Sequence, residues 1–192
     1  MNFIKKLFLK KVKKDDDGIQ KGVKKNVEHL PVDEVFVRNF VKKGGYFFYP
    51  ENLDYLEIEL RKILKFLNLS SFGVIEPEYK QLLTKLNIPF TAEWQKVNNL
   101  LGGCEHLIAN EGAILTTEKN SRSWRNQELP KHRIIIALAS QIVSHKTEAL
   151  IKINNNYQKP PANIQTMSIF AKPADGLSVG TWYKTFLFLI EN

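Results

Sequence analysis

Cysteine is scarce in this 192-residue sequence, which contains Cys104 and no other. A lone thiol forms no intrachain disulfide, so we expect a reducing, cytoplasmic environment. It also cannot supply the several thiolates of an iron–sulfur cluster. The four histidines lack the close spacing of zinc ligands, and no dinucleotide-binding glycine fingerprint is present. The sequence therefore predicts no metal site and no cofactor within this chain.

Long apolar runs are also missing, and none reaches the length of a transmembrane helix. The formal net charge is +8, but it is unevenly distributed. Residues 1–31 hold nine lysines and four acidic residues, whereas residues 32–192 hold nineteen basic and sixteen acidic residues. A nucleic-acid-binding domain carries its basic charge on a folded face, with aromatic residues interleaved. The nearly balanced body therefore argues against nucleic acid as a partner.

The N-terminal segment carries most of the excess positive charge. If residues 1–14 form a helix, its apolar side chains share one face and its lysines the other. That pattern is typical of contact with a membrane surface or a partner, and a frayed, solubilising tail is the alternative. Residues 15–26 are charged, contain two glycines and read as a linker. We therefore predict a basic amphipathic leader and linker over residues 1–30, and one domain over residues 31–192.

The first half of the domain alternates between helical and strand patterns. Hydrophobic residues make up 43% of the sequence, which is enough to form a core. We expect a helix over 34–43 capped by Asp33, a strand over 46–49, a helix from Asn52 or Asp54 to about residue 67, a strand over 72–76, a helix opened by Pro77 and a short strand over 88–91. This order is typical of an α/β sheet with crossover helices.

The second half has more strands. Residues 104–117 have the pattern of a hairpin or of two closely spaced strands, and residues 133–139 form a continuous apolar run. Ser140 is expected to cap a helix over 141–155, and closing strands are expected over 164–170 and 183–191. We therefore predict an α/β fold with a mixed central sheet and flanking helices.

Three stretches of the second half resemble a known family in their order and separation. CEHLIANEGAILTT, residues 104–117, stands where that family has alanine-glutamate-threonine-glycine inside a strand pair. ELPKHRIIIALASQIV, residues 128–143, stands where it has leucine-proline, a histidine or other polar residue, branched aliphatics and a helix. PPANIQTM, residues 160–167, followed by KTFLFLIEN stands where it has threonine-alanine-aspartate-isoleucine-glutamate and a final strand. The family is that of the LUD-domain, or lactate-utilisation, proteins. Residues 31–103 fit it only in the order of their elements.

The resemblance implies a fold similar to the sugar-phosphate isomerase and CoA-transferase group. It also implies a role in the oxidation of L-lactate to pyruvate, alongside separate iron–sulfur subunits. Such partner subunits would be needed here, because Cys104 alone cannot hold a cluster.

This chain departs from the family pattern at several positions. The acidic residues of the first and third motifs fall at Asn110, Asn163 and Gln165, and the usual histidine falls at Arg133, with His132 one residue earlier. Amides keep hydrogen bonding, but they do not act as general bases. The departures therefore favour binding over acid-dependent catalysis.

Glu111 is the candidate catalytic carboxylate. Asn110-Glu111-Gly112 has the composition of an ordinary turn, in which Asn tolerates and Gly supplies a positive φ, and Glu111 then points to solvent. In the functional interpretation, Glu111 instead lies at a strand end that lines a ligand-binding cleft.

A basic loop, SRSWRNQELPKHR over residues 121–133, offers a site for an anion. Arginine grips a carboxylate or phosphate through two parallel hydrogen bonds, so a lactate-like or phosphorylated small molecule would suit it. The alternative is a solvated basic loop. We expect this loop to cross the carboxyl edge of the sheet. The predicted ligand-binding residues are Asn110, Arg122, Ser123, Arg125, His132, Arg133, Asn163 and Gln165.

The first functional hypothesis is an accessory or small-carboxylate-binding component of L-lactate oxidation. A CoA-transferase-like or isomerase-like enzyme that uses Glu111, and a non-catalytic interaction protein, remain the alternatives.

Overall fold

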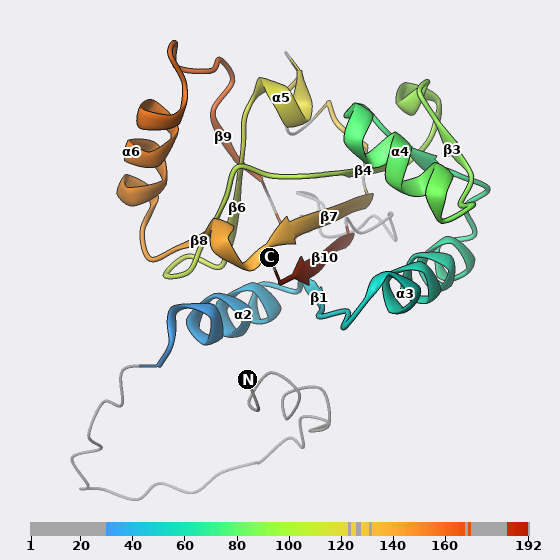
Figure 1. Cartoon of the computed structure of the whole chain (residues 1–192), viewed down its shortest axis with the longest axis horizontal. Coiled ribbons are helices and arrows are strands. Elements are labelled where there is room, and N and C mark those ends of the chain that lie inside the picture. The colour runs from blue at the N-terminus through green and yellow to red at the C-terminus, as the bar shows by residue number, and fades with distance from the viewer. Residues whose placement is uncertain are drawn as a thin grey trace, which may run out of the picture.

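The computed structural model describes residues 30–122, 124–125, 128–130, 132–167, 169 and 184–191 (Figure 1). The predicted leader and linker, apart from Leu30, lie outside the described residues. Within the described part of the chain, no helix combines the length and the apolar character that a membrane crossing requires.

A four-stranded parallel sheet lies at the centre of the fold. Its strands, in spatial order, are β1 (Tyr46–Phe48), β10 (Lys184–Ile190), β7 (His132–Leu138) and β4 (Asn99–Gly102). All three neighbouring pairs are parallel, so the carboxyl ends of the four strands meet at one edge. A small parallel pair, β2 (Phe72–Gly73) and β3 (Phe90–Thr91), joins this sheet through a parallel bridge between Val74 and Leu101.

A second sheet packs on one face of the parallel sheet. Its strands, in spatial order, are β8 (Ile142–Val143), β5 (His106–Ile108), β6 (Ala113–Thr116) and β9 (Gln165–Met167). The β5–β6 and β6–β9 pairs are antiparallel and the β5–β8 pair is parallel. The predicted α/β fold with flanking helices is therefore confirmed. Strand directions are mixed in the second sheet, whereas the central sheet is parallel throughout its described strands.

In the described part of the chain, the helices α2, α3, α4 and α6 cover these sheets. Helices α3 (Leu53–Phe66) and α4 (Pro77–Lys85) bury apolar side chains against one face of the parallel sheet. Helix α2 (Val32–Lys42) shares the core on the opposite face with the second sheet. Helix α6 (Lys146–Asn156) packs on the outer side of the second sheet (Figure 1). The domain is therefore layered, with buried apolar cores on both sides of the parallel strands.

Local capping signals account for two helix starts. The side chain of Asn52 is the N-cap of α3, and its Oδ1 accepts a hydrogen bond from the Tyr55 amide at 2.9 Å. Pro77 opens α4, where its missing N–H costs nothing. The prediction for α2 was wrong in detail: Pro31 is the N-cap residue, and Asp33 lies within the first turn.

The start of the helix predicted over residues 141–155 was placed too early. Ala139–Gln141 form a short 3-10 turn, Ile142 and Val143 form β8, and α6 starts only at Lys146. Leu107 and Ile108 of β5 pair with these two residues, so ladder hydrogen bonds replace the helical ones. Long-range strand pairing overrides the local helical spacing here.

Candidate functional site

The carboxyl edge of the parallel strands contains a topological switch point. After β2, the chain passes through α4 to β3, which lies farther from the centre of the sheet. After β4, the chain continues to β7, which lies closer to the centre. Open α/β sheets bind ligands where adjacent strands send their connections in opposite directions. The residues that follow β2 and β4 therefore form the candidate functional site.

Asn99 holds these two strands in alignment. Its side chain is fully buried, and its Oδ1 accepts a hydrogen bond from the Gly73 amide at 3.2 Å. Its Nδ2 donates to the Ser71 carbonyl at 3.0 Å. The amide side chain thus takes the place of ladder hydrogen bonds where β2 approaches β4.

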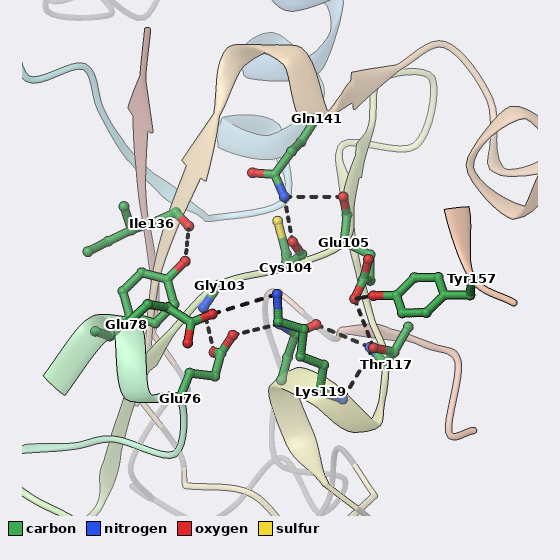
Figure 2. A network of polar contacts seen from close by, with 12 residues as sticks. Glu76, Glu78, Gly103, Cys104, Glu105, Thr117, Lys119, Ile136, Gln141 and Tyr157 are labelled. Atoms are coloured by element: carbon green, nitrogen blue, oxygen red, sulfur yellow. Dashed lines mark hydrogen bonds and ion pairs between the residues drawn. The ribbon is translucent and has the colours of Figure 1, made fainter. Parts of the chain in front are cut away.

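Glu76 is the central residue of the site (Figure 2). It follows the Val74 bridge, precedes Pro77 and is only 4% exposed. Its Oε1 accepts a hydrogen bond from the Gly103 amide at 2.8 Å, and its Oε2 accepts one from Asn120 Nδ2 at 3.0 Å. Burial raises the pKa of Glu76 above its ordinary value, and these two hydrogen bonds offset part of that effect.

Two consecutive glycines leave room for this carboxylate. A Cβ at Gly102 would lie 2.5 Å from Glu76 Oε1, and a Cβ at Gly103 would lie 2.4 Å from the Tyr79 hydroxyl oxygen. Tyr79 donates its hydroxyl hydrogen to the Ile136 carbonyl at 3.2 Å, and burial raises the pKa of Tyr79. The end of β4 therefore admits the side chains of Glu76 and Tyr79, which a larger residue at either glycine would exclude.

A second set of hydrogen bonds braces the chain beyond Gly103. Gln141 Nε2 donates to the carbonyls of Cys104 and Glu105 at 2.5 and 3.2 Å. The Glu105 carboxylate accepts hydrogen bonds from the hydroxyls of Thr117 at 3.0 Å and Tyr157 at 2.9 Å (Figure 2). Burial raises the pKa of the Cys104 thiol, which keeps it neutral and unreactive. This group of contacts is structural.

The predicted catalytic residue Glu111 lies elsewhere, in the turn between β5 and β6. Gly112 has φ +54°, and a Cβ there would lie 2.4 Å from the Asn39 carbonyl carbon, so only glycine fits. Asn39 Nδ2 donates to the carbonyls of Ala109 and Asn110 at 2.9 and 3.2 Å, which fixes the turn against α2. The turn interpretation holds for Gly112, although Asn110 does not adopt a positive φ. A base role for Glu111 stays a prediction.

The amides of the third motif hold the basic loop in place. Asn163 Nδ2 lies within 3.0 Å of Ser121 Oγ and 2.8 and 2.9 Å of the carbonyl oxygens of Arg122 and Trp124. Gln165 Nε2 reaches Ser121 Oγ at 3.3 Å and the Trp124 carbonyl at 3.0 Å. All of these partners can accept hydrogen bonds, which explains why amides rather than carboxylates suit positions 163 and 165.

The predicted cationic residues differ in their exposure. Arg122 and Arg125 are exposed, and neither forms an ion pair with another described residue. Arg133 is 5% exposed, and its Nε donates to the Pro130 carbonyl at 2.7 Å. His132 and Arg133 lie at the amino end of β7, opposite Asn99 and Leu100, so the expectation that they lie at the carboxyl edge was wrong. A strand that begins at His132 necessarily places both residues at its start. Ser123 lies outside the described residues.

Sequence reasoning missed Glu76 and Asn120. The available signals were an acidic residue at the end of a predicted strand, just before Pro77, and the Gly102–Gly103 pair at the end of another strand. Neither signal indicates that the two segments meet. Among the described residues, no three His, Cys, Asp or Glu side chains are grouped so as to hold a metal ion.

Comparisons with known proteins extend the fold assignment. No family model matches the chain. A probable disease resistance protein of Arabidopsis thaliana is 30% identical over 114 residues, which cover 55% of this chain and 13% of that protein. The chain thus corresponds to about an eighth of the length of this relative.

A solved structure covers far more of the chain. The crystal structure of a DUF162 family protein from Deinococcus radiodurans aligns with a TM-score of 0.59 over 85% of this chain and 99% of the other. The two sequences are 13% identical over this alignment, so the likeness is one of fold. DUF162 is the LUD-domain family. The chain therefore has the α/β fold of a protein from the family that its second-half motifs resemble.

Proposed function

We propose that this chain is a LUD-domain protein that binds a small carboxylate as an accessory component of L-lactate oxidation. The observation that carries this proposal is the fold likeness to a DUF162 family protein over nearly the whole of that protein. The ordered motifs over residues 104–192 support the same family. Cys104 is alone and buried, so iron–sulfur chemistry would be carried out by separate partner subunits.

The proposed anion contacts are Arg122 and Arg125. Both side chains are exposed, and Asn163 and Gln165 donate hydrogen bonds to the backbone carbonyls of Arg122 and Trp124. A fixed backbone lowers the entropy lost when a guanidinium group orders around a carboxylate. Binding rather than catalysis suits this loop, because the neighbouring side chains at positions 163 and 165 are amides that cannot accept a proton as bases do.

Isothermal titration calorimetry of the full chain with L-lactate and pyruvate tests this proposal. A charge-assisted hydrogen bond contributes about 1.5–3 kcal/mol, so Arg122→Ala with Arg125→Ala should weaken binding by at least about tenfold. Exposed substitutions change stability by less than about 0.5 kcal/mol, so the melting temperature should stay nearly constant.

The matched control removes two exposed cations elsewhere, through Lys85→Ala with Lys159→Ala. This control variant should bind like the wild type. The proposal fails if the wild type binds neither ligand, or if the two arginine substitutions leave the affinity unchanged.

A further inference from the structure

We propose that a cavity beside the start of α2 binds a protonated primary amine with a short hydrocarbon chain. The cavity measures about 350 Å³, which is within the size range of small-molecule sites. It is lined by Val32, Asp33, Tyr49, Ala139, Ile142, Leu189 and Glu191. None of these residues belongs to the basic loop, so the site is independent of the proposed function.

The cavity lies at the carboxyl edge of the parallel sheet. Tyr49 follows β1, Ala139 follows β7 and Glu191 follows β10. The two strands that flank β10 send the chain to opposite faces, because β1 leads to α3 on one face and β7 leads to β8 on the other. Open α/β sheets bind ligands in the crevice where connections diverge in this way. The position of the cavity therefore points to a ligand.

The charge of the lining indicates a cation. Asp33 and Glu191 supply two carboxylates, and the described lining residues include no Lys, Arg or His. Neither carboxylate forms an ion pair with another described residue. A smaller adjoining cavity of about 180 Å³, which shares Tyr49 and Glu191, adds Glu51 and also has no basic residue in its described lining. The region is therefore negative, although the chain carries a net charge of +8.

Three acceptor groups match the three hydrogens of a primary ammonium group. Tyr49 donates its hydroxyl hydrogen to Glu191 Oε1, which leaves the hydroxyl oxygen and Glu191 Oε2 as acceptors. The carboxylate of Asp33 is the third group, and it lies in the first turn of α2, where the helix dipole favours its ionised form. A bound ammonium group would therefore meet an acceptor with each of its hydrogens.

Tyr49 reports how close the two carboxylates are to each other. Its pKa is raised to about 12 by burial, by its hydrogen bond to Glu191 and by the charges of Glu191 and Asp33. The hydroxyl therefore keeps its hydrogen at neutral pH. Because both carboxylates act on one hydroxyl, they also repel each other, and a bound cation would relieve that repulsion.

The remaining lining is apolar and suits a hydrocarbon chain. Leu189 is 1% exposed, and Ala139 and Ile142 pack against the core that α2 shares with the second sheet. A short alkyl chain can cover this surface while its ammonium group meets the carboxylates. A metal ion fits less well, because two carboxylates are few ligands, and the described residues hold no group of three His, Cys, Asp or Glu side chains suited to a metal.

A titration of the full chain with n-butylamine, followed by ligand-observed NMR, tests this inference. The amine is protonated at neutral pH. Two matched probes separate its features: 1-butanol has the same chain without the charge, and n-butyltrimethylammonium has the charge without N–H hydrogens. The wild type should bind n-butylamine at least about tenfold more tightly than either, because both lack the charge-assisted hydrogen bonds.

Asp33→Asn with Glu191→Gln removes both charges and keeps the sizes of the side chains. This variant should bind n-butylamine at least about tenfold more weakly. The matched control, Glu34→Gln with Asp54→Asn, removes two acidic residues from the first turns of α2 and α3 that line neither cavity, and it should bind like the wild type. Ala139→Leu keeps both carboxylates and fills the cavity, so it should also weaken binding. Circular dichroism confirms the fold of each variant.

Three results would overturn the amine site. The wild type may not bind n-butylamine, Ala139→Leu could keep the full affinity, or the control could lose as much affinity as Asp33→Asn with Glu191→Gln. The same variants are titrated with L-lactate, whose proposed contacts are Arg122 and Arg125 outside this cavity. Unchanged L-lactate binding together with any of the three results would refute the amine site and leave the proposed function standing.

Discussion

Asn163→Asp would test whether the amides of the third motif are donors that hold the basic loop. In the wild type, Asn163 Nδ2 faces three acceptors, namely Ser121 Oγ and the carbonyls of Arg122 and Trp124. Aspartate has nearly the same shape, but at neutral pH it accepts and does not donate. Its carboxylate would lie against two carbonyl oxygens.

The magnitude follows from the number of hydrogens on the amide. Two hydrogens satisfy two acceptors at a time, and each neutral hydrogen bond contributes about 1 kcal/mol net. We therefore expect the free energy of unfolding to fall by about 2 kcal/mol, before any repulsion is added. In a domain of this size, that change lowers the melting temperature by about 4–8 °C. The backbone effect is small, because Asn and Asp both tolerate the positive φ of 56° found at this position.

Urea denaturation followed by circular dichroism measures this loss directly. Asn68→Asp is the matched control, because Asn68 has φ 53° and is exposed at the end of α3. A new negative charge near a helix C-terminus costs about 0.3–1 kcal/mol, so this control should remain clearly more stable than Asn163→Asp. If the two variants lose the same stability, the argument from donors at position 163 is refuted.

Two further predictions concern the switch point. Because burial raises the pKa of Glu76, the protonated form favours folding; this contribution is fully present below the unfolded pKa of 4.5 and is lost as the pH rises through the folded pKa. The stability of Glu76→Gln relative to wild type should therefore increase from pH 4 to pH 8 in urea titrations, and a constant difference would contradict the pKa shift. Gly102→Ala should cost about 1–3 kcal/mol, because its Cβ would lie 2.5 Å from Glu76 Oε1. In a Glu76→Ala background that cost should shrink, and an undiminished cost in the double-mutant cycle would show that another contact is responsible.

Local signals predicted the elements whose ends depend on their own residues. Asn52 caps α3 and Pro77 opens α4 because each acts on the next turn of the chain. The apolar run over 133–139 predicted β7, since a strand buried on both faces has few polar positions. The turn at Gly112 was also predicted from a local signal, because the positive φ of this position suits glycine.

The missed features depend on contacts between distant segments. Glu76 is separated from Gly103 by 27 residues and from Asn120 by 44, so its burial and partners cannot be inferred from its neighbours in the chain. Ile142 and Val143 have helical spacing, and only their pairing with β5 makes them a strand. In the sequence, Asn163 and Gln165 stand where the similar family has acidic residues. In the structure, their partners, Ser121 Oγ and the Trp124 carbonyl, are acceptors that require donors.

The place of β10 in the parallel sheet has a consequence for how the domain is made. Tyr46 of β1 pairs with Phe186 of β10, and β10 separates β1 from β7. During synthesis on the ribosome, the edge of β7 that pairs with β10 therefore stays unpaired until residues 184–190 have left the ribosome. Pairings so distant in sequence fold slowly and leave strand edges open to self-association. Chains released before β10 is complete should aggregate, because the edges of β1 and β7 that pair with β10 are then left unpaired.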